Sequence, residues 1–158
     1  MGTAVAAVLA LPSIASADEM LSPISLGAVA NRDFQAATVG FGMGPYDDKL
    51  HLLFFGRAAV GPTLNAGMGG VSGGYAFVER DHFHFGVDLG VSVGGGRYRG
   101  AGAGVLAAAE PGLFMRFLSE KIGAIHVNAG WYQPVYVRHD GVGGAAMLSL
   151  AWSPFYDR

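Results

Sequence analysis

The clearest pattern in the chain is a strict alternation of apolar residues with small or polar ones. In residues 83–93 (FHFGVDLGVSV), every odd position is apolar, whereas the even positions carry His, Gly, Asp, Gly and Ser. Residues 125–131 repeat the pattern, with His126, Asn128 and Gly130 on the second face. Successive side chains of a strand point to opposite faces, so a period of two predicts β-strands with one apolar face.

Weaker versions of this alternation fill most of the remaining chain, and together they predict eight strands. The other six are expected near residues 23–30, 37–43, 50–60, 67–77, 105–117 and 145–155. Short segments rich in Gly, Pro, Asn or charge separate the runs, at 31–32, 44–49, 61–63, 79–82, 94–102, 119–121 and 138–144. Most runs approach the roughly 9–11 residues that a tilted strand needs to cross a bilayer.

The two faces of the predicted strands differ in bulk, and this difference indicates which face lies inside. The second face is mostly Gly, Ala, Ser and Asn with a few charges. Because an eight-stranded barrel has room inside only for its own side chains, the small face suits the interior and the bulky face suits lipid. We therefore predict an all-β fold, a closed antiparallel up-and-down transmembrane β-barrel. The alternative, a soluble barrel, would need the bulky face inside.

Aromatic residues gather near one set of turns. Ring side chains are typical of membrane–water interfaces, because an apolar body there carries a polar edge. With an even number of strands, we assign this level and both termini to the periplasmic side, and the 31–32, 61–63, 94–102 and 138–144 connections to the outside. The aromatic residues in this level are Phe41, Tyr46, Tyr75, Phe77, Phe83, Phe85, Phe117, Trp152, Phe155 and Tyr156.

Composition supports a membrane protein and excludes several classes of function. Hydrophobic residues make up 51% of the chain and charged residues only 14%. The net charge of −2 leaves no basic face for nucleic acid. The chain has no cysteine, which excludes disulfides, thiolate catalysis and cysteine-based metal sites.

The N-terminal segment has the features of a secretory signal peptide. Residues 3–17 (TAVAAVLALPSIASA) carry no charge and end in the small-x-small sequence Ala15, Ser16 and Ala17. The apolar stretch is shorter than the roughly 20 residues that a membrane-spanning helix needs. We expect residues 1–17 to be removed and residues 18–158 to form the barrel domain. No Lys or Arg stands between Met1 and the apolar stretch, so we expect either a true start upstream of Met1 or a trimmed sequence.

With these features, residues 22–156 resemble the small eight-stranded outer-membrane β-barrel superfamily (OmpA/OmpX-like). The resemblance rests on the signal peptide, the hairpin spacing, the alternation and the aromatic-rich final segment 147–156 (MLSLAWSPFY). It implies a location in the bacterial outer membrane, contact with outer-membrane lipids and insertion by the barrel-assembly machinery. That machinery reads a terminal aromatic residue, whereas Asp157 and Arg158 follow Tyr156 here.

Candidate chemistry lies among ionisable residues on the predicted inner face. Hairpin geometry places Asp88 roughly opposite Glu110, and Arg116 close to His126. Two carboxylates in a confined space need a cation nearby. We interpret the group as a salt-bridge network that fills a narrow lumen, with a proton path or a catalytic acid–base pair as the alternative. The predicted network is Arg57, His84, Asp88, Glu110, Arg116, His126 and Asn128, and His51 also points inward if residues 50–60 keep their parity.

Signals for catalysis and cofactors are weak. Outer-membrane lipid A deacylases resemble the chain in size, but their motif places a Ser two residues after a His, and no His here is followed in that way. His82 and His84 could chelate a metal, yet two histidines beside a turn are expected to be solvated. The glycine string at 94–104 lacks the Lys-Ser/Thr of a phosphate-binding loop. We therefore predict no catalytic residue, no cofactor and no bound metal.

Three function classes remain open at this point. The first is a structural or surface-interaction barrel that uses loops 94–102 and 138–144 as its contact surface. The second is a narrow channel for small or apolar solutes, which the inner-face glycines favour because they leave space. The third is a lipid-modifying enzyme. The sequence leaves open whether the lumen is plugged and how many copies assemble.

Overall fold

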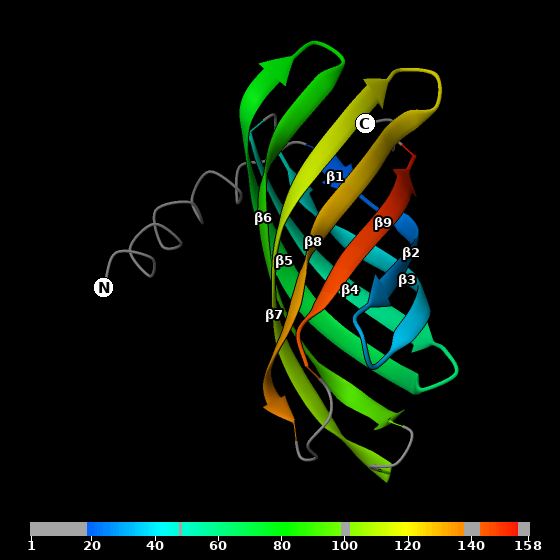
Figure 1. The fold of residues 1–158 in the computed structure, drawn as a ribbon. Helices are drawn as coiled ribbons and strands as arrows, with labels where there is room; N and C mark the ends of the chain where they lie inside the picture. The colour runs from blue at the N-terminus through cyan, green and yellow to red at the C-terminus, as the bar shows by residue number, and fades with distance from the viewer. Residues whose placement is uncertain (1–18, 48, 99–101, 138–142, 155–158) are drawn as a thin grey trace.

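The computed structural model describes residues 19–47, 49–98, 102–137 and 143–154, and its strands form one antiparallel sheet (Figure 1). Residues 1–17, the predicted signal peptide, lie outside the described residues. No helix within the described ranges is long and apolar enough to cross a membrane. The strands are β1 (Glu19–Leu21), β2 (Ile24–Ala30), β3 (Gln35–Tyr46), β4 (Leu50–Val60), β5 (Leu64–Arg80), β6 (Phe83–Tyr98), β7 (Gly102–Ser119), β8 (Gly123–Val137) and β9 (Ala145–Ser153).

The sheet closes on itself into a barrel. Each strand from β2 to β9 pairs with the next strand along the chain, and β9 returns to pair with β2. β1 pairs with the far end of β3, so β1 and β2 form one barrel strand with a break at Ser22 and Pro23. At the break, the Pro23 carbonyl accepts a hydrogen bond from the Gly42 amide at 2.8 Å. The predicted closed antiparallel barrel of eight strands is confirmed.

The two ends of the barrel differ, and they are named here by their connections. The turn side carries the short turns at residues 81–82 and 120–122, at the top of Figure 1. The loop side is the opposite end, with the connections at residues 31–34 and 61–63. Strands β5 to β8 are the longest, and their hairpins extend beyond the shorter strands in Figure 1.

The bulky apolar side chains lie on the outside of the barrel, as the alternation predicts. On β6, Leu89 is 58% exposed, whereas its neighbour Ser92 on the other face is 6% exposed. A soluble barrel with an apolar core would show the reverse arrangement. A continuous apolar exterior of this size is typical of a surface covered by another phase or partner. Large exposed members include Ile24, Leu26, Phe41, Phe54, Val91, Leu113, Trp131, Leu148, Leu150 and Trp152.

The glycine-rich segment at 94–102 differs from its prediction as a loop. β6 continues to Tyr98 and β7 begins at Gly102, and these two residues pair directly. Residues 94–96 also pair with β5 on the other side. Two full hydrogen-bond ladders outweigh the low strand propensity of glycine, so only residues 99–101 are left for the loop, and these lie outside the described residues.

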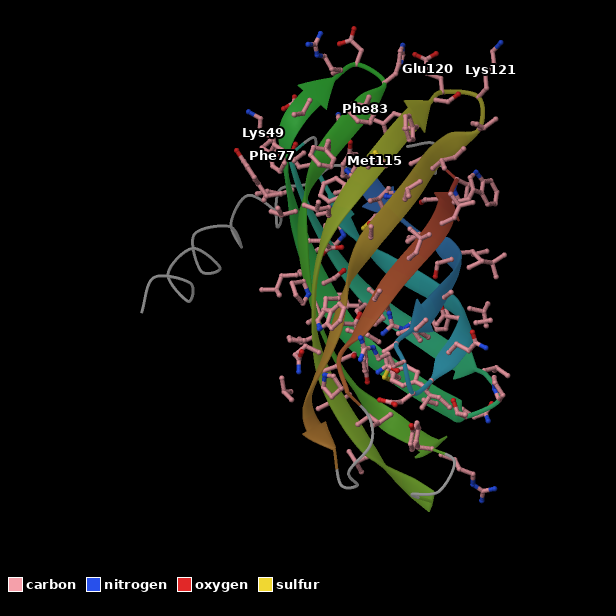
Figure 2. All side chains as sticks on the ribbon, viewed as in Figure 1. Lys49, Phe77, Phe83, Met115, Glu120 and Lys121 are labelled. Carbon is pink, nitrogen blue, oxygen red and sulfur yellow. The ribbon has the colours of Figure 1, made fainter. Side chains whose placement is uncertain are left out.

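The aromatic level near the turn side is largely present, with one correction. Phe77 and Phe83 lie on the β5–β6 hairpin toward the turn side, the same end of the barrel as Glu120 and Lys121 in Figure 2. Phe77 packs edge-on against Phe85, with ring centroids 5.0 Å apart. Tyr46, however, points into the barrel and is only 3% exposed, so its assignment to the outer level is wrong. Phe155 and Tyr156 lie outside the described residues.

The barrel interior contains an apolar cluster at each end. The turn-side cap consists of Leu21, Tyr46 and Ala124, with Leu53 and Leu118 packed against them. The loop-side cap consists of Val29, Phe34, Ala36, Ala59, Leu64, Ala66, Leu106, Ala108, Tyr132 and Ala145, with Met68 and Tyr98 beside it. Ionisable side chains fill much of the lumen between the two caps.

Candidate functional site

A charge pair crosses the lumen from β4 to β7. The guanidinium of Arg57 donates to both carboxylate oxygens of Glu110, and the contact from Nη1 to Oε2 is 3.1 Å. Such a two-pronged geometry is among the stronger arrangements of charged hydrogen bonds. The Ser92 hydroxyl donates to Oε1 of Glu110 at 2.6 Å, and Arg57 Nη1 also lies 3.1 Å from the sulfur of Met147. The carboxylate is thereby bound from two further strands, β4 and β6.

A second cluster lies around Arg116, nearer the turn side. Arg116 is 1% exposed, and its Nη2 lies 2.7 Å from Nδ1 of His51, while its Nε donates to Nδ1 of His126 at 3.3 Å. A guanidinium has only donors, so Nδ1 of both imidazoles must accept. His51 Nε2 in turn lies 3.7 Å from Oδ2 of Asp88. The result is a chain from His126 through Arg116 and His51 to the Asp88 carboxylate.

Aromatic rings hold the Arg116 guanidinium from the sides. Its central carbon lies 4.4 Å from the ring centroid of Tyr46 and 5.1 Å from that of Phe114. The electron-rich face of a ring attracts a cation, more strongly where water is excluded. The inward orientation of Tyr46 therefore has a cause, since its ring covers a buried cation and its hydroxyl lies 3.3 Å from Nδ1 of His84.

The hairpins predicted from the sequence placed two pairs of ionisable residues near each other on adjacent strands, and the structure agrees with one of these pairs. Arg116 lies directly opposite His126, closer than predicted. Asp88, however, pairs with Gly112, and Glu110 pairs with Gly90, so the predicted Asp88–Glu110 pair is wrong by two residues. The whole β6–β7 ladder has this register, since Phe83 pairs with Phe117 at one end and Tyr98 with Gly102 at the other. The two carboxylates consequently have different partners, the Arg57 guanidinium for Glu110 and the His51 imidazole for Asp88.

All seven residues of the predicted network lie on the inner face of the barrel. Arg57, Asp88, Glu110, Arg116 and His126 take part in the two clusters described above. His84 contacts Tyr46 instead, and Asn128 lines the central cavity.

Three polar residues outside that set of seven also belong to the lumen network: Tyr46, Ser92 and His51, whose inward orientation agrees with the expected parity of residues 50–60. Ser92 shares the parity of His84 and Asp88, so the alternation alone could have included it. His82 lies exposed in the turn rather than beside His84 on one face.

Glycines on the inner face make room for these large side chains. Gly74 of β5 pairs with both His51 and Asp88. A Cβ atom on Gly74 would lie 2.1 Å from the His51 ring, which is far inside contact distance. Arg57 faces Gly40 across the β3–β4 ladder, and Glu110 faces Gly90. The glycine excess of the sequence is thus partly explained by the bulk of the ionisable residues opposite.

A cavity of about 120 Å³ remains at mid-height in the lumen. Along the direction of β4, the cavity lies between Leu53, which packs against the turn-side cap, and Ala59 of the loop-side cap. Within the described ranges, no group of three or more metal-ligating side chains surrounds this or any other point. Its polar lining comes from the eight strands β2 to β9 and comprises Ser25, Thr38, Arg57, Ser72, Asp88, Glu110, Asn128 and Ser149.

Comparison with known proteins identifies the fold. No protein-family model matches the sequence, and no curated protein matches it significantly. The N-terminal β-barrel domain of OprF from Pseudomonas aeruginosa is similar in structure, with a TM-score of 0.63 and 11% identity over 89% of this chain and 98% of that domain. Ail, the attachment invasion locus protein of Yersinia pestis, gives a TM-score of 0.53 and 8% identity over 87% of this chain and 97% of its own. The chain therefore has the fold of the small eight-stranded outer-membrane β-barrels.

Proposed function

We propose that the protein is an integral outer-membrane β-barrel with a structural or surface-interaction role, that its lumen is closed to solutes, and that it performs no catalysis. The observation that carries the proposal is the Arg57–Glu110 pair, which spans the lumen between two apolar caps. A charge pair that crosses an eight-stranded barrel leaves little room for a passing solute.

The membrane location rests on the barrel exterior. Leu26, Leu89 and Leu150 are each more than half exposed on different strands, and lipid is the phase that such a surface suits. The proposal includes a location in the outer membrane, contact with its lipids and insertion by the barrel-assembly machinery. The contact surface is expected at the loop-side end of the β6–β7 hairpin, because its flanking strands extend there.

The two alternatives fit the lumen less well. Ser92 donates its hydroxyl to Glu110 rather than to an imidazole, so its surroundings do not favour a nucleophile. A narrow channel is the second candidate, and the central cavity of about 120 Å³ is the observation that favours it. The loop-side cap, with Phe34, Leu64 and Leu106 all at most 5% exposed, stands between that cavity and the outside.

Conductance of the purified full chain in planar bilayers tests the closed lumen. We expect a silent bilayer, with insertion checked independently by protease protection of reconstituted vesicles. Protein that is boiled before reconstitution serves as the background control. Regular single-channel steps that increase in number with the amount of folded protein, and are absent from the boiled control, would contradict the proposal and favour the channel.

A further inference from the structure

The cluster around Arg116 joins a buried cation to two histidines, and these contacts exist in only one protonation state. Arg116 reaches Nδ1 of His51 on β4 at 2.7 Å and Nδ1 of His126 on β8 at 3.3 Å. A guanidinium has donors and no acceptor, so each of these two nitrogens must keep its lone pair. A protonated imidazole carries an N–H at both ring positions. Neither histidine can therefore keep the contact and also bind a second proton.

Protonation of His126 would place a second cation directly beside Arg116. His126 is 5% exposed and Arg116 is 1% exposed, so little water reaches the pair to screen the repulsion. Nε2 of His126 has no hydrogen-bond partner among the described residues. No ion pair in the described part of the chain joins this histidine to a carboxylate. The added charge would stay uncompensated in a buried place, which is costly.

His51 differs from His126 because a carboxylate stands beside its other ring nitrogen. Nε2 of His51 lies 3.7 Å from Oδ2 of Asp88, and this carboxylate would offset a positive charge on the His51 ring. A proton taken up by His126 meets no such counter-charge. His126 is therefore the acid-sensitive member of the two histidines.

The other groups that face the cluster supply no further negative charge. Across the lumen the cluster meets a phenol and a third imidazole, and its ladder neighbours on β5 and β9 do not ionise. These groups are Tyr46 on β3 and His84 on β6, which contact each other at 3.3 Å, together with Gly74 on β5 and Ala151 on β9.

We propose that the Arg116–His126 contact is an acid-sensitive lock on the turn side of the barrel, closed while His126 is neutral and released when His126 takes up a proton. Tyr46 belongs to the turn-side cap, and its ring centroid lies 4.4 Å from the central carbon of the Arg116 guanidinium. Release of the contact would therefore loosen the cap as well as the cluster. The lock does not depend on whether the lumen conducts, so it goes beyond the proposed function.

The sign of the pH effect follows from proton binding in the two states. An imidazole in the unfolded chain has its ordinary pKa of about 6.5, so it binds a proton below that pH. The folded cluster excludes this proton, and a fall in pH consequently shifts the equilibrium toward the unfolded chain. The stability contributed by the lock is present above about pH 7 and is lost as the pH falls. Between pH 7.5 and 5.5, one excluded proton raises the unfolding equilibrium constant about tenfold.

Asparagine substitutions separate His126 from an exposed histidine. His126→Asn keeps an acceptor oxygen close to the position of Nδ1 but cannot take up a proton, whereas His82→Asn removes a histidine from the exposed turn. The full chain, refolded in detergent, is unfolded in urea at pH 7.5 and 5.5. We expect the acid-induced rise in the unfolding equilibrium constant to be about tenfold smaller in His126→Asn than in the unchanged chain. His82→Asn should respond to acid as the unchanged chain does, and an equally large response in His126→Asn would overturn the lock.

Two further measurements keep the inference testable if His126→Asn does not fold. The unchanged chain must itself show at least about a tenfold rise between pH 7.5 and 5.5, and a flat response would overturn the proposal. Arg116→Gln removes the cation but keeps a donor, so its acid response should be smaller than that of the unchanged chain. An unchanged response in folded Arg116→Gln would show that burial of His126 alone is responsible and that the lock is wrong. None of these outcomes changes the expectation of a silent bilayer, so the proposed function is tested separately.

Discussion

Glu110 is only 6% exposed, so nearly all of its hydration must be replaced inside the barrel. Two contacts from Arg57 and one from Ser92 supply that replacement. Removing water from a charge costs several kcal/mol, and a buried pair compensates only when geometry is good and the remaining lone pairs are satisfied. At the scale of single residues, the Glu110 carboxylate is thus stabilised by contacts that replace its lost hydration.

Replacing Glu110 by Gln should therefore be strongly destabilising. The change keeps the shape but leaves the Arg57 cation without a counter-charge, and losing one partner of a buried pair costs about 3–5 kcal/mol. Unfolding in urea from detergent micelles, followed by tryptophan fluorescence, measures the loss. Glu79→Gln is the control, because the exposed Lys49–Glu79 contact at 3.8 Å should contribute no more than about 1 kcal/mol. Equal effects of the two changes would contradict a structural role for the lumen pair.

Within a strand, the alternation of faces decides what each position tolerates. Gly73 and Gly74 are neighbours on β5 with opposite surroundings. Gly73 pairs with Leu52 and Leu89 on the apolar exterior, whereas Gly74 pairs with His51 in the lumen. Gly74 is required by the His51 side chain that it faces, whereas no neighbouring side chain requires a glycine at position 73.

This contrast predicts opposite responses to the same substitution. Gly74→Ala would place a methyl group 2.1 Å from the His51 ring, so the ring must shift, and such overpacking typically costs about 1–3 kcal/mol. Gly73→Ala has its nearest neighbouring atom at 3.8 Å and should be neutral or slightly stabilising. Urea midpoints of the two variants provide the comparison. A loss of stability in Gly73→Ala as large as in Gly74→Ala would show that the inner face is not the constraint.

At the scale of the whole molecule, closure of the sheet links all these elements. Each barrel strand pairs on both sides, so no hydrogen-bond ladder can be lost without opening the barrel. The exterior is apolar around the circumference, while both charge clusters lie inside. A molecule built in this way is stabilised by surroundings of lipid or detergent.

Electrophoresis in SDS tests this organisation directly. After refolding in detergent, the unheated protein should stay folded in SDS and migrate faster than the boiled protein, because a closed barrel is more compact than the denatured chain. The boiled sample is the matched control. An unchanged mobility, together with solubility in the absence of detergent, would contradict a membrane barrel.

The sequence by itself determined the number of barrel strands, their order and most of their inner and outer faces. Residues 83–93 and 125–131 predict their outer and inner sides correctly, because strand side chains alternate strictly and a local period of two carries that information. Short turns between successive runs then predict antiparallel neighbours. The inward orientation of Arg57 and Arg116 follows from the same parity.

Only the tertiary structure decided which inward side chains meet. Asp88 and Glu110 lie on adjacent strands, yet a shift of two residues in the β6–β7 hairpin separates them into different clusters. The Arg57–Glu110 and His51–Arg116 contacts join residues 53 and 65 positions apart, across the lumen rather than along a ladder. Alternation is a property of each strand alone, whereas contacts across a barrel depend on register, strand tilt and closure, which no local pattern records.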